Sequence, residues 1–131
     1  MEYIVGKTAG FCYGVKNAVE KSEKAIENEK PICCLGEIVH NKNVVKDLEN
    51  KGIIFIENLN QNLKKRKTII RAHGVTKEVY KEADKMKINL IDLTCPKVLK
   101  IHKIVSEYNE EEYYIFLIGS KKHPETIGTA S

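Results

Sequence analysis

The chain has 131 residues, of which 42% are hydrophobic and 31% are charged. This length and composition are typical of about one globular domain with a buried core, and they exclude a multidomain or disordered chain. The longest apolar block, residues 113–118, is far shorter than the ~20 residues of a membrane span, so we expect no membrane association. The formal charge is +4. The basic runs at 64–67 and 121–122 lack interleaved aromatic residues, which favours solvated loops over polyanion binding, and we expect no nucleic-acid partner.

The first residues carry neither the basic region nor the apolar stretch of a secretory signal. We therefore expect the mature chain to start at Met1 and to be cytoplasmic, in a reducing compartment. The four cysteines are then expected to be thiols, metal ligands or catalytic groups rather than disulfides.

Short apolar runs alternate with amphipathic helical windows along the whole chain. The runs that predict strands are 1–5, 32–39, 53–56, 68–71, 88–93 and 113–118. Helical spacing of apolar residues covers 15–26, 43–50, 79–86 and 98–108, with Gly52 closing the second window and Pro96 opening the last. Several strands are continuous apolar runs, as in a parallel sheet covered on both faces. The pattern predicts an α/β fold in which a parallel sheet is flanked by helices.

The order of these elements also predicts a domain organisation. Residues 14–96 form one near-complete α/β domain, preceded by an N-terminal segment, 1–13. Residues 97–131 begin a second, truncated domain, in which the strand 113–118 is followed by a loop over 119–128. We expect the next helix to begin only at Ser131.

The loops that follow the predicted strands carry most of the chemically useful side chains. In an open parallel sheet these loops meet at the carboxyl edge, where helix N-termini favour anions. The side chains expected at this edge are Cys12, His40, His73, Cys95, His123 and Glu125. Three histidines at one edge can make a pocket for a phosphate-bearing ligand, although a single loop histidine is usually only a surface residue.

Cys12 and Cys95 each stand where a helix begins, a position that favours the metal-binding thiolate. Taken singly, each would more often be a small buried side chain. They are 83 positions apart, so no zinc-ribbon spacing applies and the fold would have to bring them together. Cys33 and Cys34 are adjacent in a strand and point to opposite faces, so we interpret both as core residues, and we interpret His102 in the same way.

Glu125 follows His123 by two positions, in a loop that contains two glycines. A carboxyl group beside a histidine and near a metal is a candidate for proton transfer. The alternative for Glu125 is an ordinary loop glutamate that faces solvent.

Five ordered blocks of the sequence closely resemble the LytB/IspH family. The blocks are Ala9 to Val15, Gly36 to Asn41, Arg71 to Val75, Asp92 to Pro96 and Lys122 to Glu125. Members of this family are 4-hydroxy-3-methylbut-2-enyl diphosphate reductases, the last enzymes of the non-mevalonate isoprenoid pathway. The resemblance implies three α/β domains in a pseudo-threefold arrangement around a 4Fe-4S cluster.

The resemblance further implies that Cys12 and Cys95 are two of the three cysteine ligands of the cluster, whose fourth iron is open to substrate. The third ligand would lie in a third domain beyond residue 131, and neither Cys33 nor Cys34 matches it. The segment 1–13 would pack with that absent domain. On this basis the chain is expected to be less than half of a full-length member and inactive alone.

The resemblance also implies roles at the substrate. His40 and His73 would help to bind the diphosphate, His123 would line the pocket, and Glu125 would supply the proton that lets water leave. Two electrons would come from a ferredoxin- or flavodoxin-type donor, and the products would be isopentenyl and dimethylallyl diphosphate. The alternatives from the residues alone are a small zinc-binding module using Cys12, Cys95 and Cys34, and a phosphate-binding or purely structural module without catalysis.

Overall fold

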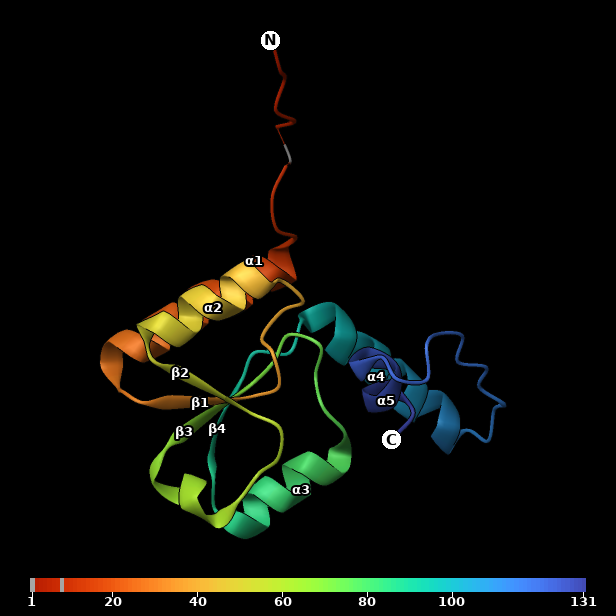
Figure 1. The fold of residues 1–131 in the computed structure, drawn as a ribbon. Coiled ribbons are helices and arrows are strands. Elements are labelled where there is room, and N and C mark those ends of the chain that lie inside the picture. The colour runs from red at the N-terminus through yellow and green to blue at the C-terminus, as the bar shows by residue number, and fades with distance from the viewer. Residues whose placement is uncertain (1, 8) are drawn as a thin grey trace.

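A parallel sheet of four strands forms the centre of the molecule (Figure 1). The computed structural model describes residues 2–7 and 9–131. The strands are β1 (Ile32–Leu35), β2 (Ile53–Ile56), β3 (Lys67–Ile70) and β4 (Asn89–Asp92), in the order β2-β1-β3-β4. Cys34 is paired with Phe55 on one side and with Ile69 on the other. The predicted α/β class with a parallel sheet is therefore confirmed.

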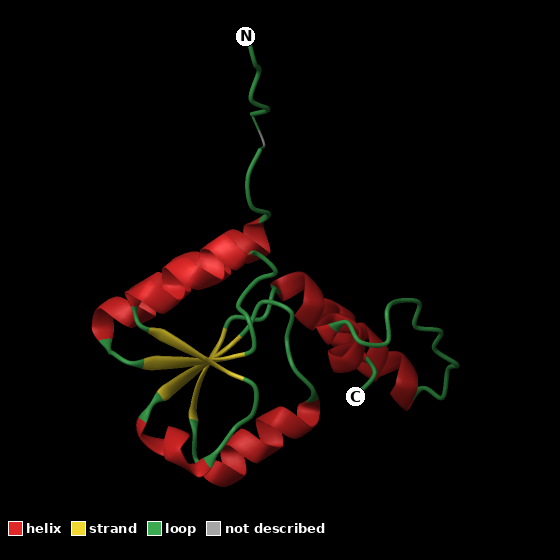
Figure 2. Ribbon diagram, viewed as in Figure 1, coloured by secondary structure: helices red, strands yellow, loops and turns green. Residues whose placement is uncertain are grey.

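Helices cover both faces of the sheet, as Figure 2 shows. The helices are α1 (Tyr13–Asn28), α2 (Lys42–Lys51), the 3-10 helix η1 (Gln61–Lys65), α3 (Lys77–Met86), α4 (Pro96–Glu110) and α5 (Pro124–Thr129). The first two pack together on one face, α3 lies on the other, and α4 and α5 lie side by side beyond the carboxyl ends of the strands (Figure 1). Within the described ranges, no helix combines the length and apolarity needed to cross a lipid bilayer.

Local sequence signals account for where α2 begins and ends. The Asn41 side-chain oxygen accepts hydrogen bonds from the backbone N–H groups of Asn43 (3.1 Å) and Val44 (3.3 Å), which caps the helix. Gly52 ends it with a φ of 117°, a left-handed conformation that glycine adopts without steric cost. The helix predicted over 43–50 and closed by Gly52 is thus confirmed, one residue longer at each end.

The core has a separate cluster on each face of the sheet. Cys34 packs with Ile32, Leu48 and Ile69 on the side of α1 and α2, whereas Cys33 packs in the other cluster, on the side of α3. Both cysteines are buried, as expected, and burial raises the pKa of the Cys34 thiol to about 12. The Cys34 thiol is therefore not a reactive group at neutral pH.

Two predicted strands are absent from the structure. Residues 2–5, within the predicted strand 1–5, are exposed and not in a strand, and Met1 lies outside the described residues. Residues 113–118 are likewise irregular and exposed. The predictions were wrong because a strand needs a hydrogen-bonded neighbour, and none of the described strands lies beside either segment.

Two element boundaries differ from the prediction by more than two residues. The run 32–39 is a strand only as far as Leu35, because Gly36 adopts a φ of 72° and turns the chain out of the sheet. The segment 119–128 is not all loop, and the next helix begins at Pro124 rather than at Ser131. Proline fits the first position of a helix because its missing N–H would have no intrahelical partner there.

The long helix α4 begins at Pro96 as predicted, but its apolar stripe is only partly covered. Val98 is buried, whereas Ile101 and Tyr108 are about half exposed. His102 is partly buried rather than a full core residue.

Candidate functional site

Backbone hydrogen bonds hold the loops after β1, β3 and β4 side by side beyond the end of the sheet. The N–H of Ala72 donates to the carbonyl of Ile38 (3.3 Å), and the N–H of Cys95 donates to the carbonyl of Ala72 (2.9 Å). These bonds continue the pairing of the strands past their carboxyl ends. As a result His73, next to Ala72, is held between the loop that carries His40 and the start of α4.

Three histidines meet at this edge. The ring of His40 stacks on that of His73 with centroids 4.2 Å apart, and the His123 ring meets both edge-on at 5.6 and 5.9 Å. They come from the loops after β1 and β3 and from the residue that precedes α5. The structure thus brings together three side chains that are 33 to 83 positions apart in the sequence.

His73 is the most constrained of the three. Burial, together with the nearby positive charges of His40, Arg71 and His123, lowers the pKa of His73 from 6.5 to about 4. Its Nδ1 atom is buried and has no hydrogen-bond partner. The imidazole is therefore neutral at pH 7, with one ring nitrogen left to a ligand.

The first turn of α5 places Glu125 beside this histidine cluster. His123 precedes the helix, and its Nδ1 accepts a hydrogen bond from the backbone N–H of Glu125 (3.3 Å). Glu125 itself is exposed. Its carboxyl group is therefore free to move, while its backbone is fixed to the histidine.

Cys12 and Cys95 stand directly before α1 and α4, and neither side chain caps its helix with a hydrogen bond. The Cys95 sulfur lies over the first turn of α1, because a Cβ added to Gly14 would be only 2.6 Å from Sγ. Because Gly14 has no side chain, the Cys95 thiol can approach α1, the helix that Cys12 precedes.

Two free thiols at helix N-termini fit the donor set of an iron-sulfur cluster, although they are not enough to complete it. Among the residues that the structure describes, no group of three histidine, cysteine or acidic side chains is placed to hold a metal ion. A third ligand would have to come from outside these residues, since Cys33 and Cys34 are buried in β1.

An aspartate orients the turn that leads into Cys95. Asp92 Oδ1 accepts hydrogen bonds from the backbone N–H (2.9 Å) and the hydroxyl (2.5 Å) of Thr94, and Oδ2 accepts one from the Tyr80 hydroxyl (2.8 Å). Burial raises the pKa of Tyr80 to about 12, and the hydrogen bond with Asp92 acts in the same direction. The role of Asp92 was not predicted from the sequence, although aspartate side chains commonly accept a hydrogen bond from the backbone two residues further on.

Arg71 was also missed as a separate feature of this edge. Its guanidinium is partly buried where β3 ends, and its Nε has no hydrogen-bond partner. The sequence does contain one signal for it, because Arg71 is a charged residue that directly follows a buried strand.

With this geometry in view, comparison with known proteins identifies the family. The family model described as LytB protein matches residues 4–131, and the chain belongs to this family. The chain is 44% identical over 132 residues to the 4-hydroxy-3-methylbut-2-enyl diphosphate reductase of Caldanaerobacter subterraneus subsp. tengcongensis. It is 45% identical over 130 residues to the enzyme of the same name from Alkaliphilus oremlandii. The predicted family is thus confirmed.

Solved structures agree with this result. The E-1-hydroxy-2-methyl-but-2-enyl-4-diphosphate reductase from Plasmodium falciparum superimposes with a TM-score of 0.90 at 43% identity, covering 94% of this chain and 39% of that one. A structure of (E)-4-hydroxy-3-methyl-but-2-enyl diphosphate reductase gives 0.83 at 37% identity. Each of the two alignments with curated relatives covers 98% of this chain but only 46% of the relative, so the chain spans about half of their length.

Proposed function

We propose that this chain is the part of a 4-hydroxy-3-methylbut-2-enyl diphosphate reductase that supplies the diphosphate-binding histidines, two cluster ligands and the proton donor. The observation that carries the proposal is the meeting of three imidazoles at the sheet edge where Cys12 and Cys95 begin two helices. The names of the relatives support the choice of substrate, because each is called a reductase of this diphosphate.

His40 and His73 are proposed to bind the diphosphate, and His123 to line the pocket. Imidazole N–H groups donate to phosphate oxygens, and such bonds strengthen when the ring is charged. The His40 and His73 rings are stacked with centroids 4.2 Å apart, so both are proposed to contact the same diphosphate.

Cys12 and Cys95 would hold a 4Fe-4S cluster together with a cysteine from outside the described residues. When bound, the cluster would supply the two electrons of the reduction and an open iron that acts as a Lewis acid on the substrate hydroxyl. Gly14 contributes by leaving room for the Cys95 sulfur. The electrons would reach the protein from a ferredoxin- or flavodoxin-type donor.

Glu125 is proposed to deliver the proton that lets the substrate hydroxyl leave as water. Its place in the first turn of α5, tied to His123 through the backbone, puts an exposed carboxyl group next to the histidine cluster. The products would be isopentenyl and dimethylallyl diphosphate. We further propose that 14–96 is the first domain of the reductase and that 97–131 begins its second.

Reductase activity can be tested in a chimera in which this chain replaces the matching segment of the Alkaliphilus oremlandii enzyme, which is 45% identical. Turnover of the diphosphate with a chemical reductant is the readout, and absorbance near ~400 nm reports the cluster. Cys12→Ser or Cys95→Ser should remove the absorbance, while Cys33→Ser should leave it unchanged. An active chimera in which both ligand variants keep their cluster would contradict the proposed ligands.

Diphosphate binding can be tested on the 131-residue chain itself, with pyrophosphate as the probe. His40→Ala or His73→Ala should each weaken binding by about tenfold or more, because a hydrogen bond to a charged group is worth ~1.5–3 kcal/mol. His102→Ala, outside the cluster, is the matched control. Iron analysis of the same chain should find little or no 4Fe-4S cluster, and stoichiometric zinc on Cys12 and Cys95 would favour the zinc-binding module instead.

A further inference from the structure

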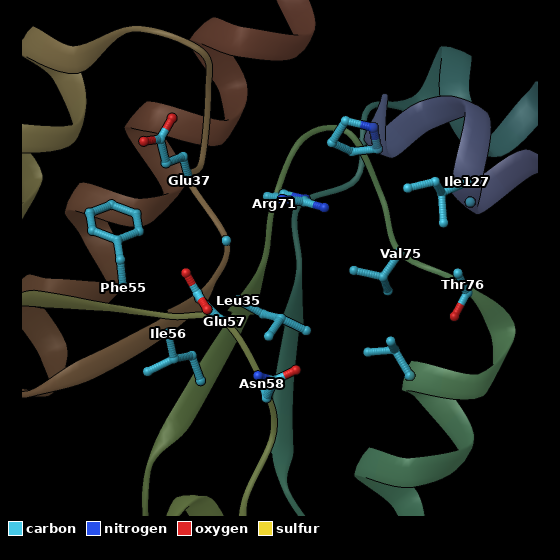
Figure 3. Close-up of a pocket in the computed structure, with 14 residues that line it drawn as sticks. Leu35, Glu37, Phe55, Ile56, Glu57, Asn58, Arg71, Val75, Thr76 and Ile127 are labelled. Atoms are coloured by element: carbon cyan, nitrogen blue, oxygen red, sulfur yellow. The ribbon is translucent and has the colours of Figure 1, made fainter. Parts of the chain in front are cut away.

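A cavity opens at the carboxyl end of the sheet, and Figure 3 shows the residues that line it. Its volume is about 810 Å³, within the usual range for small-molecule sites. None of the three clustered histidines lines it. Its walls come from the loops after β1, β2 and β3 and from α3 and α5.

The cavity lies where the strand order changes direction. From β1 the chain passes through α2 to β2 on one side, and from β3 it passes through α3 to β4 on the other. The loops that leave β1 and β3 are joined by the hydrogen bond from Ala72 to Ile38 and then lead to strands on opposite sides of the sheet. Their first residues, Gly36 and Arg71, both line the cavity. Crevices at such switch points are the usual ligand sites of open α/β sheets.

Arg71 is the one cationic side chain among the lining residues. None of the five ion pairs that the described residues form within 4.0 Å includes it, and its Nε is buried without a hydrogen-bond partner. Figure 3 shows the side chain directed from the end of β3 toward Val75 and Ile127. Burial lowers the pKa of Arg71, which means that its positive charge is incompletely solvated.

Gly36 makes this arrangement possible. A Cβ at this position would overlap the guanidinium of Arg71, and the φ of 72° is itself unfavourable for other residues. The turn after β1 therefore leaves room for the guanidinium in the wall of the cavity.

We propose that this cavity binds a small molecule that carries one carboxylate on an apolar body, with the carboxylate on Arg71. A guanidinium matches a carboxylate with two parallel hydrogen bonds. Leu35, Val75 and Ile127 offer apolar surface to the rest of the ligand. Glu37 and Glu57 also line the cavity, and Glu37 acts on the charge of Arg71, so an anion with several charges, such as a diphosphate, is repelled there.

The test uses the 131-residue chain, ¹⁵N-labelled, with 3-phenylpropanoate as the probe and the uncharged 3-phenylpropan-1-ol as the matched ligand. Titration of the acid should shift the Arg71 Nε–H signal and the amides of Val75 and Ile127 in a saturable way. The alcohol should bind about tenfold more weakly or worse, because it lacks the charge-assisted hydrogen bonds. Equal affinity of the acid and the alcohol would overturn the proposal.

Variants separate this cavity from the histidine cluster and from general charge effects. Arg71→Gln should weaken the acid by about tenfold or more, and Gly36→Ala should weaken it with Arg71 still present. Arg66→Gln makes the same charge change outside the cavity, and His73→Asn alters the cluster, so both should leave affinity within about twofold. The proposal fails if His73→Asn removes the shifts, or if Arg66→Gln weakens the acid as much as Arg71→Gln does. The amide spectrum of each variant checks its fold. If a variant does not fold, the proposal is tested by the affinities of the acid and the alcohol for the unmodified chain.

Discussion

The neutral, partly buried His73 should make the fold sensitive to acid. Its pKa is about 4 in the folded chain against an ordinary value of 6.5, so between these values the unfolded chain binds more protons. Stability therefore rises with pH through this window and falls as the pH drops from 6.5 toward 4. The loss of stability is complete below pH 4, where His73 is protonated in both the folded and the unfolded chain.

The magnitude follows from the two pKa values. Between pH 7 and pH 4.5 the linkage relation gives a loss of at most about 2 kcal/mol from this one group. Because the ring is only partly buried, solvent screening reduces this to about 1 kcal/mol. For a small protein, a loss of this size lowers the urea concentration at the unfolding midpoint by roughly 0.5 M.

Urea unfolding at pH 7 and pH 4.5 measures this loss when the chain is compared with His73→Asn. Carboxylates change the stability of both proteins in the same way, so the difference between the two pH-dependent changes isolates His73. We expect the native chain to lose about 1 kcal/mol more than the variant. Equal losses would refute the reasoning, because they would show that the imidazole is as well solvated in the folded chain as in the unfolded one.

Three further substitutions test the site. Gly14→Ala adds a methyl group 2.6 Å from the Cys95 sulfur, so it should destabilise the fold by ~1–3 kcal/mol in urea unfolding and change the rate at which Cys95 reacts with a thiol reagent; an unchanged rate would contradict the contact. Asp92→Ala removes the acceptor of three hydrogen bonds, so it should cost ~1–3 kcal/mol and lower the pKa of Tyr80 from about 12, as an ultraviolet titration of the phenol would show. In the chimeric reductase, Glu125→Gln keeps the size of the side chain but not its proton, so turnover should fall by ~10²-fold with substrate affinity retained; near-normal turnover would exclude the carboxyl group from the reaction.

Local sequence signals predicted the elements whose boundaries depend on a few neighbouring residues. Asn41, Gly52 and Pro96 mark helix ends through caps and backbone conformations that act within about four positions. The meeting of the histidine loops could also be predicted, because parallel strands send their following loops to one edge. These inferences required the order of the elements but not their packing.

The features that could not be predicted depend on contacts between distant segments. Whether 113–118 is a strand depends on a neighbour that the local sequence does not reveal. The contact of the Cys95 sulfur with Gly14 spans 81 positions and follows from how α1 and α4 are placed. The half-buried guanidinium of Arg71 was missed because an arginine after a strand usually lies in solvent.

The backbone bonds that run from Ile38 to Ala72 and on to Cys95 have a consequence for how this edge tolerates change. They use main-chain atoms only, so replacing a neighbouring side chain, such as the imidazole of His40 or His73, does not remove them. The side chains at this edge can therefore be exchanged while the backbone that presents them keeps its place. A scaffold of this kind separates the residues that recognise a ligand from the bonds that position them, and it is a suitable starting point for building a different binding site on the same sheet.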